Sequence, residues 1–144
     1  MNTSVETVNA EETYSLGVRI GRLLGPGDVV ALEGPLGSGK TCLSQGICHG
    51  LDVDEWANSP SFTLINEYSG RLQVNHCDFY RLSDLDEVEA LGIVELMDSG
   101  AVTIIEWPGL AESLLPKDAI KVSLEHVDPT KRRLTIAGLD ALAV

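Results

Sequence analysis

The stretch "ALEGPLGSGKTC", residues Ala31 to Cys42, places three glycines directly ahead of a lysine and a hydroxyl. Residues 34–41 match the pattern G-x-x-x-x-G-K-[ST], with an apolar run before it and a helical pattern after it. Glycine has no side chain and adopts positive φ, so backbone N–H groups can wrap around a phosphate chain. The helix that follows directs its unpaired N–H groups and its dipole at the anion. The stretch therefore predicts a strand, a phosphate-binding loop and a helix, in that order.

Two side chains of this loop have specific expected roles. The ammonium of Lys40 neutralises the β- and γ-phosphates of a nucleotide, and the hydroxyl of Thr41 is a ligand for Mg²⁺. The alternative is a glycine-rich turn that only precedes a helix. The residues expected to contact the nucleotide are Gly37, Ser38, Gly39, Lys40, Thr41 and Cys42.

A carboxylate ends the second continuous apolar run, "AVTIIEW". Glu106 follows a buried strand, where a charge is costly unless a cation pairs with it. We therefore expect Glu106 to bind Mg²⁺, directly or through water; the alternative is an exposed glutamate at a strand end. Trp107 follows at once and is expected to pack on the nucleotide or on a partner, with ordinary core packing as the alternative.

The stretch "HCDFYRL" joins an imidazole, a carboxylate, a phenol and a guanidinium at a strand end. Asp78 is expected to hold a metal-bound or attacking water, and Arg81 is a candidate charge clamp. The structural alternatives are a core position for Tyr80 and a surface pair between Arg81 and Asp84. For His76 we favour a core histidine whose hydrogen bonds are satisfied.

The stretch "NSPSFTL" lies between the expected phosphate-binding helix and Asp78. In nucleotide switches such a segment carries a Ser or Thr that senses the γ-phosphate. Ser61 and Thr63 are the candidates, and a polar connecting loop is the alternative.

Length and charge limit the class of protein. With 144 residues, the chain is expected to form one domain over residues 1–144, with a sizeable core. No apolar run is long enough to span a bilayer, and the polar, acidic first residues resemble neither a signal nor a transit peptide. Three cysteines without a CxxC pair indicate reduced thiols and a cytoplasmic protein. The net charge of −12 repels nucleic acid, and the cluster Lys131 to Arg133 is enough for one anionic ligand or is a solvated strand end.

Along the chain, strands and helices are expected to alternate in the earlier part, and antiparallel strands are expected in the later part. Asn9 and Glu12 are expected to cap a first helix, and Ser83 is expected to cap a helix with an acidic first turn. Strands are expected over 29–34, on both sides of a turn at Ser69-Gly70, over 101–107, and in a C-terminal hairpin of 119–127 with 132–138. This order predicts an α/β fold: a three-layer P-loop NTPase sandwich with a mixed, mainly parallel sheet and a C-terminal antiparallel hairpin.

Four segments together resemble one family. "GPLGSGKT", "SPSFTLINEY", "HCDFYRL" and "IIEWP", in this order, are similar to the TsaE (YjeE) family of small bacterial P-loop ATPases in tRNA threonylcarbamoyladenosine synthesis. The resemblance runs from about Thr13 to the "KRR" strand. It implies ATP and Mg²⁺, hydrolysis to ADP and phosphate, and binding to the TsaD and TsaB proteins as a reset or turnover factor. No strong direct grip on tRNA is expected, in agreement with the acidic charge.

The resemblance also implies residue roles. Lys40 would bind the phosphates, and Thr41 and Glu106 would bind Mg²⁺. Asp78 would lie beside the γ-phosphate. The segment Ser61–Thr63 would be the switch, although the family often has Thr where Ser61 stands. The other residues implied to lie near the nucleotide are Trp107, Arg132 and Thr13; the last two lie where the ends of the chain match poorly.

Two other functions fit the same loop. A small-molecule kinase needs an acceptor pocket and a lid with several arginines, and the sequence offers few basic residues and no lid segment. A nucleotide-gated binding module with negligible hydrolysis is the second alternative. Only Asp78 is available to orient a catalytic water, so Asp78 separates a slow ATPase from such a module.

Overall fold

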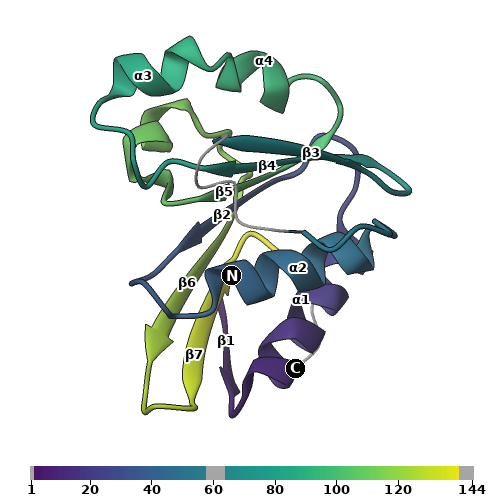
Figure 1. The fold of residues 1–144 in the computed structure, drawn as a ribbon, viewed down its shortest axis with the longest axis vertical. Coiled ribbons are helices and arrows are strands. Elements are labelled where there is room, and N and C mark those ends of the chain that lie inside the picture. Colours follow the sequence, from purple (N-terminus) through teal and green to yellow (C-terminus); the bar gives the residue numbers. More distant parts are fainter. Residues whose placement is uncertain (1, 58–63, 140–144) are drawn as a thin grey trace.

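A seven-stranded mixed sheet runs through the centre of the structure, a computed structural model that describes residues 2–57 and 64–139 (Figure 1). The strand order is β1-β7-β6-β2-β5-β4-β3. The elements are β1 (Asn2–Thr7), α1 (Ala10–Leu23), β2 (Val29–Glu33), α2 (Lys40–Gly50), β3 (Ile65–Ser69), β4 (Gln73–Asp78), α3 (Leu85–Ala90), α4 (Ile93–Met97), β5 (Val102–Glu106), the 3₁₀ helix η1 (Pro108–Leu114), β6 (Ile120–His126) and β7 (Arg132–Ala137).

Parallel pairs form the centre of the sheet and antiparallel pairs form its edges. β6, β2, β5 and β4 pair in parallel, whereas β1–β7, β6–β7 and β3–β4 are antiparallel. The mixed sheet and the C-terminal hairpin are therefore confirmed. The edge strand β1 was not predicted from the sequence, because "NTSVET" carries only one strongly apolar residue to mark a buried face.

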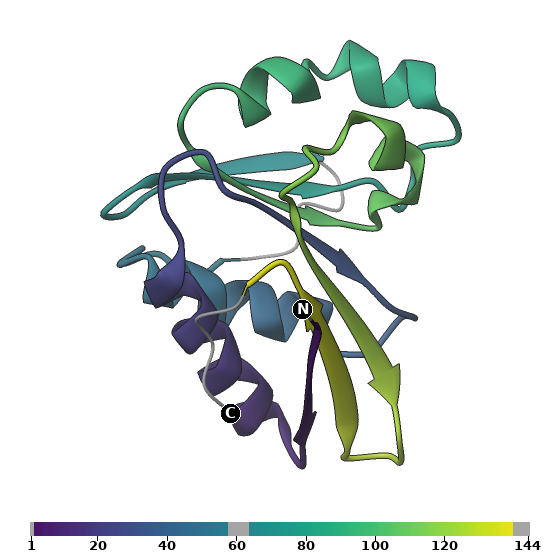
Figure 2. The ribbon, with the colours of Figure 1, turned by 180° about the vertical axis from the view of Figure 1, so that it is seen from behind.

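Helices cover both faces of the sheet, as the three-layer expectation requires. α1 and α2 lie on one face, and α3, α4 and η1 lie on the other, as the two opposite views show (Figures 1 and 2). Successive side chains of β5 point to opposite faces of the sheet and so enter both cores. Ile104 packs with the α1–α2 layer, and Ile105 packs with the α3–α4 layer. No helix within residues 2–57 and 64–139 is long and apolar enough to cross a membrane.

One helix cap is confirmed and one is corrected. The side chain of Asn9 accepts a hydrogen bond from the Glu12 N–H, 2.8 Å away, and α1 begins at the next residue. The predicted cap at Ser83 is wrong, because Asp84 is the N-cap and its Oδ1 accepts from the Glu87 N–H at 2.9 Å. Glu87 stands three residues after Asp84, the spacing that a capping box needs, and its carboxylate reaches back to the Ser83 N–H.

The sheet brings the carboxyl ends of three parallel strands to one place. Glu106 of β5 is in register with Leu32 of β2 on one side and with Asp78 of β4 on the other. The chain leaves β2 through the glycine-rich loop and enters α2 at Lys40. Ligands of open α/β sheets bind at this edge, outside the carboxyl ends of the strands.

Candidate nucleotide-binding site

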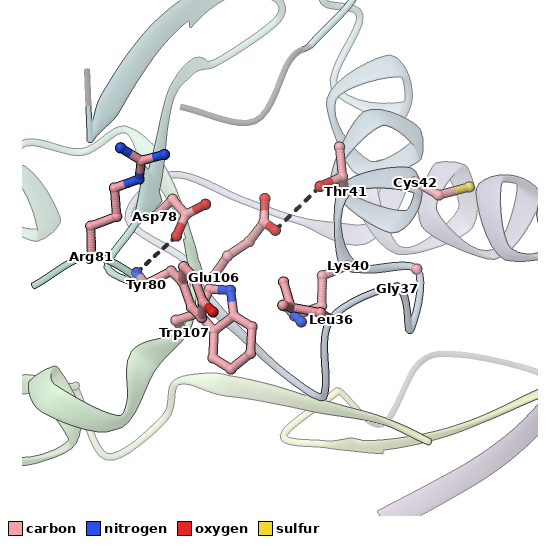
Figure 3. A pocket seen from close by; sticks show the side chains of 11 residues that line it. Leu36, Gly37, Lys40, Thr41, Cys42, Asp78, Tyr80, Arg81, Glu106 and Trp107 are labelled. Carbon is pink, nitrogen blue, oxygen red and sulfur yellow. Dashed lines mark hydrogen bonds between the residues drawn. The ribbon is translucent and has the colours of Figure 1, made fainter. Parts of the chain in front are cut away.

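A pocket of about 420 Å³ opens where the glycine-rich loop meets the ends of β4 and β5 (Figure 3). Its size lies in the range of small-molecule sites. The residues that line it are Leu36, Gly37, Gly39, Lys40, Thr41, Cys42, Asp78, Tyr80, Arg81, Glu106 and Trp107.

The loop has the backbone of a phosphate cradle. Gly37 and Gly39 have φ of +76° and +105°, the left-handed region that favours glycine. Gly39 is also the N-cap of α2 and makes no side-chain capping bond. The hydroxyl of Ser38 is buried and has no hydrogen-bond partner among the described residues. A loop of this geometry aims the N-terminus of α2 at the pocket, where the helix favours an anion.

Lys40 lies in the pocket and is almost fully buried. Its Nζ donates to the carbonyls of Gly34 at 2.5 Å and Pro35 at 2.9 Å, and it lies 4.0 Å from the ring centroid of Trp107. Burial lowers the pKa of Lys40, while the nearby carboxylates of Glu106 and Asp78 act in the opposite direction. The two carboxylates therefore offset only part of the cost of burying this ammonium, which lies at the position where phosphates would bind.

The carboxylate of Glu106 is buried, and its two oxygens face different partners. Oε1 lies 3.5 Å from the hydroxyl of Thr41, which donates to it. Oε2 lies 2.6 Å from Nε2 of His76 and 3.5 Å from the hydroxyl of Ser44. The alternative of an exposed strand-end glutamate is wrong, because only 2% of Glu106 is exposed.

His76 is a core residue, as predicted, but its environment was only half predicted. Its Nε2 bonds Glu106, whereas its Nδ1 is buried without a hydrogen-bond partner among the described residues. The sequence reasoning missed this contact with Glu106 and the approach of Ser44 from α2. The alternation of side chains along a strand could have indicated this contact. His76 stands two residues before Asp78, so both side chains lie on the same face of β4.

Asp78 ends β4 beside Glu106, and its Oδ1 accepts from the Tyr80 N–H at 2.9 Å. A core position for Tyr80 is wrong, because 52% of this residue is exposed. The ring of Tyr80 instead packs on Trp107, with centroids 4.7 Å apart. Trp107 has φ of +57°, a left-handed turn directly after β5, and its ring lies over Lys40.

The remaining predicted residues lie at different distances from the pocket. Cys42 lines it, but its side chain points away from Glu106 (Figure 3), and burial raises the pKa of its thiol. Nη2 of Arg132 donates to the Gly37 carbonyl at 3.3 Å. Thr13 is buried behind Gly39, with its hydroxyl 2.7 Å from that of Thr7. Neither Arg132 nor Thr13 lines the pocket, and the switch candidates Ser61 and Thr63 lie outside the described residues.

The donor set in the pocket fits a magnesium ion shared with phosphates. Among residues 2–57 and 64–139, no group of three or more His, Cys, Asp or Glu side chains is arranged to hold a metal ion. Mg²⁺ usually takes one or two protein oxygens and completes its shell with phosphate oxygens and water. The Thr41 hydroxyl and the Glu106 carboxylate, 3.5 Å apart beside the loop, match that requirement.

Comparisons with known proteins identify relatives of this chain. The family model "Threonylcarbamoyl adenosine biosynthesis protein TsaE" matches residues 7–134. The tRNA threonylcarbamoyladenosine biosynthesis protein TsaE of Treponema pallidum is 39% identical over 129 residues, covering 90% of this chain and 96% of the relative. The protein of the same name from Bacillus subtilis is 37% identical, over 92% of this chain and 84% of its own length.

A solved structure shows the same fold. The crystal structure of YdiB from Bacillus subtilis superposes with a TM-score of 0.76 and 32% identity, covering 94% of this chain and 84% of the other. The family model covers the glycine-rich loop, both strand-end carboxylates and β6, and it ends within β7. The chain therefore belongs to the TsaE family.

Proposed function

We propose that this chain is a Mg²⁺-dependent ATPase that supports the TsaD–TsaB complex in the threonylcarbamoyladenosine modification of tRNA. One observation carries the proposal. The glycine-rich loop with Lys40 and Thr41 meets both strand-end carboxylates, Asp78 and Glu106, around one pocket.

In this proposal the loop and Lys40 hold the nucleotide. Backbone N–H groups of residues 37–40 surround the phosphates, and the Lys40 ammonium neutralises the β- and γ-phosphates. Trp107 and Tyr80 form a packed aromatic pair on the same side of the pocket, which limits where the nucleotide can lie. Arg132 holds the Gly37 carbonyl from outside the loop.

Hydrolysis then needs a metal site and a positioned water. Thr41 and Glu106 would hold Mg²⁺, which neutralises charge on the phosphate oxygens when it is bound. Asp78 is buried, but it lines the pocket, so its carboxylate can orient a water and accept its proton. The reaction yields ADP and phosphate.

The relatives' names and the charge of the chain support its place in tRNA modification. The relatives are named for threonylcarbamoyladenosine biosynthesis. A net charge of −12 disfavours a direct grip on tRNA, so the nucleotide cycle is expected to act on protein partners, TsaD and TsaB, as a reset step.

Phosphate release from ATP and Mg²⁺ tests the proposal, first with the chain alone and then with TsaD and TsaB added. Slow release that rises with the pair is the expected result. Nucleotide binding without release in either condition would instead favour a nucleotide-gated binding module. Transfer of the phosphate to an added nucleoside or small alcohol would favour a kinase.

A further inference from the structure

The two oxygens of the Glu106 carboxylate have separate surroundings. Oε2 is bound by His76 at 2.6 Å inside the protein, whereas Oε1 faces the Thr41 hydroxyl, which lines the pocket. The side chains of His76 and Glu106 are only 1% and 3% exposed. One oxygen is thus anchored in the core and the other is presented to the site.

Strand register explains how the histidine reaches this carboxylate. Asp78 pairs with Glu106 at the end of the parallel β4–β5 ladder, and His76 pairs with Ile104 one step deeper. Ile104 packs with the α1–α2 layer, and side chains two residues apart on a strand share a face. Glu106 therefore lies on the same face as His76, and its carboxylate turns back to meet the imidazole.

His76 is the strong donor to this oxygen. The hydroxyl of Ser44 has one hydrogen and lies closer to the Lys40 carbonyl, at 2.9 Å, than to Glu106, at 3.5 Å. An ionised carboxylate only accepts, so the imidazole donates through Nε2–H, and hydrogen bonds to ionised groups are about twice as strong as neutral ones.

Packing alone does not account for a histidine at this position. Nδ1 of His76 is buried and has no hydrogen-bond partner among the described residues. An unsatisfied buried acceptor destabilises the folded state, and an apolar side chain of similar size would avoid that cost. The bond to Glu106 is the interaction that offsets it.

We infer that His76 is a positioning residue that holds Glu106 with Oε1 directed at the magnesium site. The inference rests on the proposed function, since it assigns Glu106 to the metal. Residues that hydrogen-bond to a metal-ligating side chain and orient it typically contribute about 10–100-fold to metal affinity. His76 would therefore affect the Mg²⁺-dependent part of nucleotide binding and leave the contacts of the loop with the phosphates in place.

Calorimetric titration with ADP, in EDTA and across a series of Mg²⁺ concentrations, tests this inference without turnover. In His76→Met the ADP affinity in EDTA should equal that of the unmodified chain. The Mg²⁺ concentration for half-maximal enhancement should rise about 10-fold or more. His76→Gln places an amide N–H near the position of Nε2 and should restore the value to within about threefold of the unmodified chain, a rescue expected of a donor that acts on Glu106.

Val74→Ala is the matched control, because it opens a cavity on the same face of the same strand without removing a donor. If His76→Met does not fold, His76→Asn, whose amide is too short to reach Glu106, is compared with His76→Gln in the same way. A shift in Mg²⁺ dependence no larger than that of Val74→Ala would overturn the inference, as would equal losses of affinity in EDTA and in Mg²⁺. If the unmodified chain binds ADP equally with and without Mg²⁺, the metal site itself is refuted, and the inference with it.

Discussion

At the residue scale, the site concentrates charge in a small buried space. Lys40, Asp78 and Glu106 are each no more than 6% exposed, yet all three line one pocket. Buried charges are stable only with partners, and here the carboxylates of Glu106 and Asp78 act on Lys40 to favour its charged form, against the effect of burial.

Lys40→Ala is expected to weaken nucleotide binding. The ammonium would make charged hydrogen bonds to phosphate, each worth about 1.5–3 kcal/mol, which corresponds to roughly 10–150-fold in the dissociation constant. Calorimetric titration with ADP measures the change, and Lys117→Ala, a lysine outside the pocket, is the control. Unaltered tight binding in Lys40→Ala would contradict the cradle.

Asp78→Asn is expected to abolish most ATP hydrolysis and to leave ATP binding largely intact. The amide oxygen can still accept from the Tyr80 N–H but cannot accept a proton from water, and losing such a base costs about 10²–10⁴-fold in rate. Phosphate release and ATP titration measure the two effects separately. Asp86→Asn removes the same charge from the exposed first turn of α3 and should keep both properties. Unchanged turnover in Asp78→Asn would remove Asp78 from the catalytic role.

At the element scale, glycines set the distance between α1 and α2. A Cβ on Gly46 would lie 2.2 Å from the Tyr14 carbonyl oxygen, and one on Gly17 would lie 2.5 Å from the Leu43 carbonyl oxygen. The two helix backbones therefore touch, and no side chain separates them. Because α2 begins at Lys40, this contact also places the N-terminus of the helix at the pocket.

Gly46→Ala is expected to destabilise the fold, although Gly to Ala inside an exposed helix usually stabilises it by about 0.5–1 kcal/mol. Overpacking against a backbone atom typically costs about 1–3 kcal/mol, because neither helix can yield without moving as a whole. Urea unfolding measures the change. Gly109→Ala has no atom within 4 Å of the added methyl and should change the free energy of unfolding by less than about 0.5 kcal/mol. Equal stabilities of the two variants would show that α1 and α2 have room to separate.

At the scale of the whole molecule, the acidic charge limits contact with tRNA. The one basic cluster is engaged within the fold, since Arg132 holds the Gly37 carbonyl and Arg133 lies 3.7 Å from Glu6. A chain of net charge −12 gains little from counterion release on a phosphate backbone.

The chain alone is therefore expected to show no saturable tRNA binding at physiological salt at protein concentrations up to about 10⁻⁴ M, the weak end of non-specific affinities. Fluorescence anisotropy of labelled tRNA checks this, and the TsaD–TsaB pair serves as the comparison. Micromolar saturable binding by the chain alone would contradict the proposal that it acts through protein partners.

Two buried thiols link the stability of the whole molecule to pH. Burial raises the pKa of Cys48 and of Cys77 from 9.0 to about 12. The folded state therefore binds these protons more tightly than the unfolded state. The two thiols contribute fully to the free energy of unfolding below pH 9. This contribution is lost as the pH rises from about 9 to about 12, at about 1.4 kcal/mol per pH unit for each thiol.

Urea unfolding at pH 8, 9.5 and 10.5, in the presence of a reductant, measures this loss of stability. Cys77→Ala should show a shallower fall than the unmodified chain, because only one of the two thiols remains. Identical slopes for both proteins would show that Cys77 ionises as easily in the folded state as in the unfolded state.

Local patterns were enough to predict much of the fold and part of the site. The cap at Asn9, the C-terminal hairpin and the buried strand that ends at Glu106 each depend on neighbours a few residues away. Predictions were wrong where two neighbours competed or where burial decided the outcome. Ser83 and Asp84 both suit a cap, and the ring of Tyr80 packs on Trp107, which is remote in sequence, instead of entering the core.

The sequence by itself determined the glycine-rich loop between a strand and a helix, the alternating order of strands and helices, and the carboxylates at two strand ends, because glycine geometry and strand periodicity act over a few residues. Only the tertiary structure decided the partners of those groups. The contact of Glu106 with His76 joins positions 30 residues apart, and that of Arg132 with Gly37 joins positions 95 apart. Such contacts follow from strand order and register, which arise when the whole sheet closes and both cores are buried together.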